Sequence, residues 1–458
     1  MSGCQSLRPD GRAPPPAAPP GPRRDALLKG LGLAAAAAGG GIACAPPATP
    51  RSLAPAQLYV SLARDRVVAI LDSVTDRVVQ RISLASLGRQ GHASQIAVGP
   101  NGAAAVIGVS GTSTDVGLVC PTERAPGAAP AQTNRAGALA LALRHADRLA
   151  GRHADPQDAR CERVAVVEGE PEERRTDPAY LVTDKVGARL LTRDDLGRAY
   201  VVVSDAVGRQ DSSVTVLDLD SGSVLRHLPL GRAGERIAAL TAAPNGSHLF
   251  AAMYPVATRG ASGPIGPTRL LALDTETGRV LADSELPRET GAVSAMVVGP
   301  APQGAAAGGL PAGAQALYVA LANQAPHYQE DDSIATVVKP LLLALDIESM
   351  EPVDLWGLDH TPAGVAVRAD GRRAYILLSS GIDGPWAREL ISLSLVDGSA
   401  RRWPVPSGAF ALELSPVGKL YIADTLGDQI WRLDTRTDNL LTPLSLPGAP
   451  LALGSRPA

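Results

Sequence analysis

Aromatic and lysine side chains are scarce in this sequence, which limits both its core and its surface. Only 3% of the 458 residues are aromatic, and just two of them are phenylalanine, Phe250 and Phe410. The interior must therefore be built from Leu, Val, Ile and Ala. Lysine occurs only at positions 29, 185, 339 and 419, and the net charge is −3. This balance offers no basic surface for nucleic acid, so no nucleic-acid partner is expected.

Two kinds of pattern are missing as well. The sequence has no sustained period of 3.6 residues, which argues against helical repeats. It has no GxSxG, no CxxCH, no HExxH, and no Walker or Rossmann glycine pattern between a strand and a helix. With 47 Gly and 39 Pro, the chain instead suits a fold that turns every few residues.

The clearest structural unit is 409–446, which breaks into four short apolar runs. The runs AFALEL, GKLYIAD, DQIWRLD and NLLTPLSL are separated by SPVG, TLG and TRTD. Each run is too short for an ordinary helix, so the unit predicts four successive antiparallel strands. Both faces of such a sheet are apolar, and like neighbours stacked around an axis would cover them.

Similar units recur along the chain, at 94–169 (interrupted), 186–230, 236–286, 293–358 and 363–406. Turns such as PNG or ADG separate the first two strands, and Asp-centred turns such as LDTETG separate the last two. The first unit, 57–84, has only three runs. We expect APLALG, 449–454, to supply its missing strand and to seal a ring.

The runs "IAV.P.G" followed by "V.LD..(T/S)G.V" resemble the YVTN-type propeller repeats of bacterial exported proteins. This resemblance covers about 57–455 and implies an all-β, seven-bladed β-propeller of four-stranded antiparallel blades. It implies little chemistry, because one fold of this kind hosts many functions. A monomer is expected.

The first sixty residues have the pattern of an export signal followed by a Pro-rich tether. Arg23 and Arg24, followed by a short apolar run, resemble a twin-arginine signal, and Gly41–Cys44 resembles a lipobox with Cys44 as the lipidated residue. A plain signal with an incidental cysteine, or an uncleaved anchor helix, are the alternatives. The expected division is a signal peptide at 1–43, a Pro-rich tether at 44–56 and the propeller at 57–455. The protein is thus expected to be exported and held at the membrane through Cys44.

Long insertions are expected to crowd one rim of the propeller. Residues 110–136, 254–267, 322–339 and 380–388 all lie between second and third strands, whereas 301–314 falls on the opposite face. Loops on a rigid scaffold usually carry binding, although drift in a tolerant surface is the alternative. The ligand-face candidates on this rim are His92, Asp205, Asp211, His327, Tyr328, Asp331, Asp332, His360, Asp383 and Trp386.

These residues come from separate blades and lack metal-ligand spacing, so no cofactor is predicted and a divalent metal is the lesser alternative. Glu413 lies inside a predicted first strand, where a partner in the next blade is more probable than a catalytic role. Desolvation would raise its pKa unless Arg or hydroxyl donors meet it. Trp356, Trp403 and Trp431 are expected to pack in outer strands. Export would favour a disulfide between Cys120 and Cys161.

Two functions remain in view. The first is a non-enzymatic envelope protein that binds a protein, peptide or glycan through its loop-rich face. The second is a hydrolase of the lactonase type, since some lactonases are similar in using such repeats. The gluconolactonase group binds its metal partly through a first-blade Glu, which APLALG lacks. An accessory subunit of a redox enzyme would fit the compartment, without support from any residue.

Overall fold

The structure is a computed structural model that describes residues 56–84, 92–110, 113–119, 190–203, 213–230, 235–255, 268–287, 290–303, 311, 313–322, 338–379 and 387–457. Within these ranges every regular element is a β-strand, and no helix is long and apolar enough to cross a membrane. The predicted signal with Arg23 and Arg24, the lipidation residue Cys44 and the cysteines Cys120 and Cys161 lie outside the described residues.

The described strands form antiparallel sheets, of which four have four strands each. In spatial order these are β26 (Pro450–Ser455), β1 (Gln57–Leu62), β2 (Val67–Asp72), β3 (Arg77–Ser83); β7 (Leu191–Arg193), β8 (Arg198–Val203), β9 (Ser213–Asp218), β10 (Val224–Pro229); β11 (Glu235–Ala242), β12 (His248–Pro255), β13 (Arg269–Asp274), β14 (Val280–Glu285); and β15 (Val293–Pro300), β16 (Gln315–Leu321), β17 (Leu341–Asp346), β18 (Pro352–Gly357).

Two further sheets among the described strands have three and seven members. They are β4 (His92–Val98), β5 (Ala104–Ser110), β6 (Ser113–Val119); and β19 (Thr361–Val367), β20 (Arg373–Ser379), β21 (Ala387–Ser394), β22 (Ala400–Leu414), β23 (Lys419–Asp424), β24 (Gln429–Asp434), β25 (Asn439–Ser445). The long strand β22 explains the larger sheet. Its first part pairs with β21 and its last part with β23, so it runs from the perimeter of the ring to its centre.

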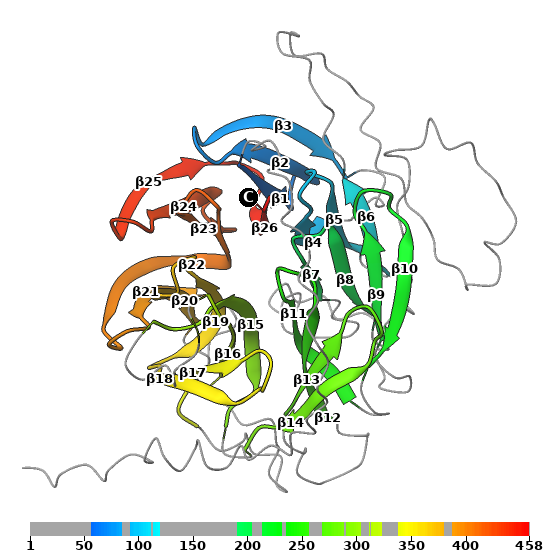
Figure 1. The fold of residues 1–458 in the computed structure, drawn as a ribbon. Helices are drawn as coiled ribbons and strands as arrows, with labels where there is room; N and C mark the ends of the chain where they lie inside the picture. The colour runs from blue at the N-terminus through cyan, green and yellow to red at the C-terminus, as the bar shows by residue number, and fades with distance from the viewer. Residues whose placement is uncertain are drawn as a thin grey trace, which may run out of the picture.

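The sheets stand around a central axis as a propeller-like ring (Figure 1). The first strand of each sheet lies innermost. These inner strands are neighbours in the order β26, β4, β7, β11, β15, β19 and the last part of β22, which returns to β26. We call the space that they surround the bore.

The two ends of the described chain meet in one sheet, as the sequence predicted. Strand β26 pairs antiparallel with β1, with Tyr59 opposite Gly454 and Leu62 opposite Pro450. The backbone N–H of Arg456 continues this contact by donating to the carbonyl of Gln57 at 2.9 Å. The ring is therefore closed by hydrogen bonds between the ends of the chain, which leaves no open edge at that junction.

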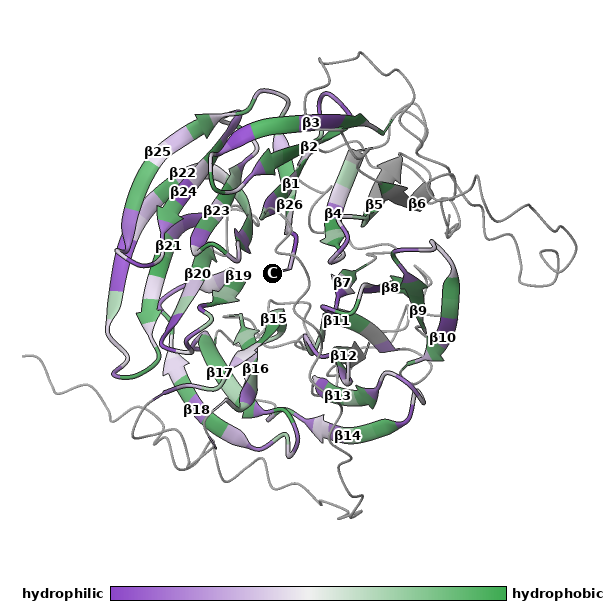
Figure 2. Cartoon of the chain, turned by 45° about the horizontal axis from the view of Figure 1, so that its top comes forward, coloured by the Kyte–Doolittle hydropathy of each residue, from purple (hydrophilic) through white to green (hydrophobic). Residues whose placement is uncertain are grey.

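The core consists of middle strands that are buried on both faces. In β1, β16 and β20 nearly every residue is buried, because each sheet is covered by a neighbour on either side. Figure 2 shows the same division, with mainly hydrophobic middle strands and mixed outer strands such as β10 and β25. Trp356 and Trp403 are buried in outer strands and Trp431 is partly buried in β24, so the expected packing role of these tryptophans is confirmed.

Asp-centred turns join the third and fourth strands on one face, which we call the turn face. In the turn after β13, Oδ1 of Asp274 accepts hydrogen bonds from the N–H groups of Glu276 and Thr277, at 3.0 and 2.6 Å. The same turn ends at Gly278, whose φ of 70° favours glycine. The aspartates Asp72, Asp218 and Asp346 accept equivalent pairs of backbone N–H groups.

One boundary predicted from the sequence is wrong. Residues 113–119 form β6, the third strand of its sheet, where the sequence suggested an insertion over 110–136. The strand was missed because STDVGLV has only three strongly apolar residues and follows the turn-like residues Ser110, Gly111 and Thr112. The connection between β5 and β6 is consequently short, and the long intervening segment of this unit follows its third strand.

Candidate functional site

Most of the ligand-face candidates lie outside the described residues. These are Asp205, Asp211, His327, Tyr328, Asp331, Asp332, Asp383 and Trp386. The other two candidates, His92 and His360, are among the described residues. His92 is the first residue of β4, and the exposed His360 directly precedes β19. Because β4 and β19 are separated around the ring by β7, β11 and β15 on one side and by β26 and β22 on the other, these two histidines belong to distant blades.

The long connections between second and third strands share one face, which we call the loop face. They run from Val203 to Ser213, from Pro255 to Arg269, from Leu321 to Leu341 and from Ser379 to Ala387. Antiparallel order places them opposite the Asp-centred turns. Two long connections between described strands leave from the turn face, one between Pro300 and Gln315 and one after Val119 at the end of β6. The loop face carries the four long connections between second and third strands, and loops on a rigid scaffold often carry binding.

No group of three or more His, Cys, Asp or Glu residues among the described residues could hold a metal ion. This finding concerns the described ranges alone and leaves the loop-face candidates untested. The expectation that the protein has no cofactor, with a divalent metal as the minor alternative, therefore stays a prediction.

A polar cluster at the turn-face end of the bore is the first feature of interest. Ser455 of β26 lies between two charged residues that reach it from other inner strands. Its N–H and its hydroxyl donate to Oε1 of Glu413 in β22, at 2.9 and 2.5 Å. Its carbonyl accepts from Nη2 of Arg193 in β7, at 3.2 Å. Since β4 stands between β26 and β7, this hydrogen bond links two inner strands that are not direct neighbours.

The cluster fixes β26, the strand that closes the ring. Glu413 thus has the partner in a neighbouring blade that the sequence favoured. Burial nevertheless raises the pKa of the Glu413 carboxyl, because the two donors from Ser455 are neutral and Arg193 acts only at longer range. A carboxyl that is desolvated without a direct countercharge is a common feature of functional sites, and also of structural networks.

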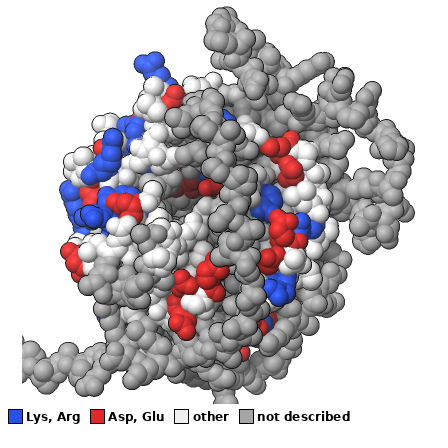
Figure 3. Space-filling model, viewed as in Figure 1, with Lys and Arg blue, Asp and Glu red and all other residues white. Residues whose placement is uncertain are grey.

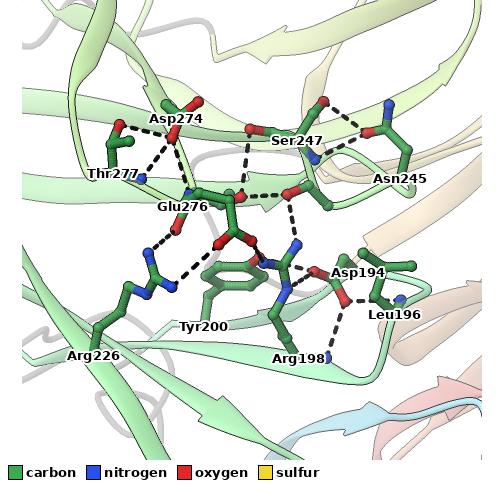
Figure 4. Close-up of polar contacts among 12 residues, drawn as sticks. Asp194, Leu196, Arg198, Tyr200, Arg226, Asn245, Ser247, Asp274, Glu276 and Thr277 are labelled. Carbon is green, nitrogen blue, oxygen red and sulfur yellow. Dashed lines mark hydrogen bonds and ion pairs between the residues drawn. The ribbon is translucent and has the colours of Figure 1, made fainter. Parts of the chain in front are cut away.

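A second set of contacts joins neighbouring sheets on the turn face (Figure 4). Arg198 of β8 extends across to the next sheet, where Nη1 meets Oε1 of Glu276 at 2.7 Å. Its Nε also pairs with the fully buried carboxylate of Asp194 at 2.6 Å, and the Tyr200 hydroxyl donates to that carboxylate at 2.8 Å. Burial raises the pKa of Tyr200 far above its ordinary value, which keeps this hydroxyl a donor. Arg226 adds a second contact to Glu276 at 3.3 Å.

A related arrangement recurs at two other junctions of the ring, and we call the contact of a second-strand cation with an acid in a neighbouring Asp-centred turn the turn latch. At these two junctions the tyrosine of the same second strand also contacts that acid. Lys419 and Tyr421 contact Asp76 at 2.6 and 2.8 Å. Arg373 and Tyr375 contact Asp438 at 3.1 and 2.8 Å. These acids are occupied by structural contacts, so the turn face forms a rigid base for the loop face.

The surface charge gives no extended area of one sign in the view of Figure 3. Lys and Arg gather on the left, over β21 to β25, while Asp and Glu are spread along the right and lower parts. Acidic atoms are also visible in the hollow at the centre. A mixed surface of this kind agrees with the small net charge of −3.

Sequence reasoning singled out Glu413 but not its partners. Arg193 and Ser455 lie 262 residues apart in the chain, and Glu413 lies 42 residues before Ser455. The only available signal was the placement of each residue near the end of a predicted first strand. Which inner strands become neighbours depends on how many sheets close the ring, and local patterns do not encode that.

The ring of antiparallel sheets, with strands ordered from the bore to the perimeter, defines the chain as a β-propeller protein. No family model and no curated protein matches the chain.

Several solved structures resemble the fold. Apo AztD from Citrobacter koseri matches with a TM-score of 0.45 and 14% identity, covering 88% of this chain and 98% of that one. Dihydro-heme d1 dehydrogenase NirN in complex with DHE matches with a TM-score of 0.47 and 13% identity, covering 89% and 77%. Kuenenia stuttgartiensis hydrazine synthase gives 0.46 and 15%, covering 85% and 92%. Their functions differ, and at these values none carries over to this chain.

Proposed function

We propose that the chain is an exported, lipid-anchored propeller that acts as a binding or scaffold protein at the cell envelope through its loop face. The observation that carries this proposal is the shared face of the long connections between second and third strands, set on a ring that is fastened on its other face by turn latches. A rigid scaffold lowers the entropy that loops lose on binding. An envelope protein, a peptide or a glycan are the partner classes this surface suits.

Photo-crosslinking from defined positions tests the binding face. A photoreactive phenylalanine analogue is placed at Asp331 or Asp383 in the loop-face connections, and at Ser221 or Glu348 in turns on the opposite face as matched controls. We expect a discrete adduct in cells from the loop-face positions only. Equal adducts from both faces, or none from the loop face, would contradict the proposal.

A second experiment removes one connection without touching the strands. Residues 323–337 are replaced by TLGD, the sequence of the tight turn 425–428 that joins β23 and β24. The control shortens 304–310 on the turn face. Loss of the loop-face adduct only in the first variant supports the proposal. Hydrolysis of a lactone panel by the purified protein would instead favour the lactonase alternative, and EDTA would distinguish metal-dependent from metal-independent turnover.

The export and the anchor are tested separately. Cys44→Ser is expected to release the protein from the membrane fraction, because a thioether-linked lipid would be lost. Replacing both Arg23 and Arg24 by Lys is expected to block export by a twin-arginine route. Unchanged fractionation of both variants would contradict the anchored form, without affecting the binding face. The Cys120–Cys161 disulfide belongs to the same proposal and is tested by thiol labelling with and without reductant.

We infer that the ring has seven blades and that the repeats are of the YVTN type. Support comes from β22, whose two halves pair with different strands and so serve two blades, and from the three-stranded sheet β4–β6, which fits a blade with its outer strand outside the described residues. A cryo-EM or crystal structure that counts the blades directly tests this inference.

A further inference from the structure

The cations of the three turn latches share one position, the residue of the second strand directly opposite the end of the third strand. The opposed pairs are Arg198 with Asp218, Arg373 with Ser394, and Lys419 with Asp434. In β12 the same position belongs to His248, opposite Asp274. The chain therefore has, at this one place, a side chain whose charge depends on pH where the latches have a permanent cation.

The acid of a latch is also present opposite His248. Glu348 lies in the Asp-centred turn between β17 and β18 of the adjacent sheet, and its backbone N–H donates to the central aspartate of its turn as that of Glu276 does. Nε2 of His248 faces Oε2 of Glu348 at 3.8 Å, whereas Nη1 of Arg198 meets Oε1 of Glu276 at 2.7 Å. The imidazole and the carboxylate are thus in place, but their separation is longer than a hydrogen bond.

The other contacts of the imidazole explain this separation. The hydroxyl of Ser247 donates to Oδ1 of Asn245 at 2.8 Å (Figure 4) and lies 2.6 Å from Nδ1 of His248. A hydroxyl has one proton, so both contacts form together only when Nδ1 carries the ring proton and donates to Ser247. In the neutral ring Nε2 then has a lone pair that faces the carboxylate of Glu348, and two acceptors form no hydrogen bond. A second proton makes Nε2 a charged donor.

No tyrosine hydroxyl supplements this contact. At the latches of Tyr375 and Tyr421 the hydroxyl donates to the acid at 2.8 Å, and this contact does not depend on the charge of the neighbouring cation. Phe250 holds the equivalent place in β12 and has no hydroxyl. Its ring instead stacks on His248, with centroids 5.9 Å apart and 13° between the planes, which orients the imidazole. The contact with Glu348 therefore depends on the imidazole proton.

Charged groups reach His248 from three elements in the described part of the chain. Glu348 faces it from the adjacent sheet, and Asp274 of β13 is its cross-strand partner. The pKa of Asp274 is lowered first by the backbone N–H of Thr277 and, as a smaller cause, by the charge of His248. Arg198 reaches the turn before β12 from the preceding sheet, and its own charge is already paired with two carboxylates. The surroundings thus supply negative charge for a protonated imidazole.

We propose that His248 and Glu348 form a turn latch that is closed by a proton, between the sheet β11–β14 and the sheet β15–β18. When the imidazole takes up a proton from solvent, Nε2 donates to Glu348 and the junction gains an ion pair like those of the other latches. This contribution to stability is present at low pH and is lost as the pH rises through the range in which histidine titrates. The same two sheets carry the loop-face connections 256–268 and 322–340, so the latch stiffens the part of the ring that supports them.

A double-mutant cycle in the purified full chain tests the latch. Urea unfolding of the parent, His248→Gln, Glu348→Gln and the double variant is measured at about pH 5.5 and about pH 8, on either side of the histidine range. We expect the two residues to be coupled by about twofold to fivefold in the unfolding equilibrium constant at the lower pH, the size of an exposed ion pair, and to be uncoupled at the higher pH. His248→Arg restores the residue type of the other latches and should be coupled to Glu348 at both pH values. Glu351→Gln, an exposed acid after the same turn, is the matched control and should show no coupling to His248.

Nitrogen-15 NMR of histidine-labelled protein observes the ring directly, and His248→Gln identifies its signals. We expect the neutral ring at the higher pH to carry its proton on Nδ1. A neutral ring with the proton on Nε2, no coupling at the lower pH, or the same coupling at both pH values in the parent background would each overturn the latch. Because these measurements use no ligand, their failure leaves binding through the loop face intact, and the reverse also holds.

Discussion

At the scale of single residues, the tyrosines near the start of the second strands combine burial with a fixed hydrogen bond. Tyr59, Tyr200, Tyr318, Tyr375 and Tyr421 are fully buried, and each hydroxyl has a partner. Phe250 holds the equivalent place in β12 without a hydroxyl. An aromatic side chain thus fills this position in six second strands. The hydroxyls of Tyr59, Tyr375 and Tyr421 reach a turn of the neighbouring blade, whereas those of Tyr200 and Tyr318 bind within their own sheet.

Tyr421→Phe is expected to lower the free energy of unfolding by about 1–2 kcal/mol, because Asp76 and the carbonyl of Ser73 lose a buried donor. Urea unfolding measures the change. Phe250→Leu serves as a comparison in which packing changes without loss of a hydrogen bond. A Tyr421→Phe variant as stable as the parent would show that Lys419 and Arg432 satisfy Asp76 by themselves.

Glu413 predicts a pH dependence of stability. Burial raises its pKa in the folded state, so the folded protein holds this proton more tightly than the unfolded chain does. Its contribution to stability is therefore present at low pH and is lost as the pH rises from the ordinary carboxyl pKa through the raised one. Glu413→Gln should remove this slope, and the amide oxygen can still accept from Ser455. Unfolding measured between pH 4 and 8 in both proteins checks the difference, and parallel curves would contradict it.

At the scale of elements, the turn between the third and fourth strands is ordered by its own aspartate and also contacts a neighbouring sheet. Asp274 organises its own turn, while Glu276 in the same turn receives Arg198 and Arg226 from the preceding sheet. The pKa of Asp274 is lowered first by the backbone N–H of Thr277. A turn that is rigid before assembly presents its acid at the right place for the latch.

Asp274→Ala is expected to cost about 1–2 kcal/mol of stability, since two backbone N–H groups lose their acceptor. Glu348→Ala is the matched control in the corresponding turn of the next sheet. Its side chain is 73% exposed, and within the described ranges its carboxylate meets only His248, at 3.8 Å, so a change within about 0.5 kcal/mol is expected. Thermal unfolding of both variants gives the comparison, and a smaller loss for Asp274→Ala than for the control would refute the role of the turn.

At the scale of the whole molecule, the closure of the ring depends on β26. Besides its pairing with β1, this strand is held by Thr425, whose hydroxyl donates to the carbonyl of Pro450 at 2.7 Å. The carboxylate of Asp428 accepts from the N–H of Ala449 at 2.8 Å, and Glu413 and Arg193 hold Ser455 at the other end. Contacts from several sheets thus converge on one short strand.

Deletion of residues 450–458 is expected to lower the melting midpoint by about 10 °C or more, because Leu451, Ala452 and Leu453 are removed from the core and the edge of β1 loses its partner strand. Deletion of 456–458 alone is the control. It removes the contacts from Arg456 to the carbonyls of Pro100 and Gln57 but keeps β26. If the longer deletion melts like the parent, the ends of the chain do not close the ring.

The sequence by itself determined the strands, their turns and the pairing of the chain ends. Short apolar runs and Asp- or Gly-centred turns are local signals, and the three-run first unit required a strand from elsewhere, which β26 supplies. The position of β6 was missed because its composition is weakly apolar. Only the tertiary structure decided that Glu413, Ser455 and Arg193 meet, and that Tyr421 reaches Asp76 across 345 residues. The physical reason is that ring closure sets which inner strands become neighbours, and this geometry follows from how all the sheets pack together.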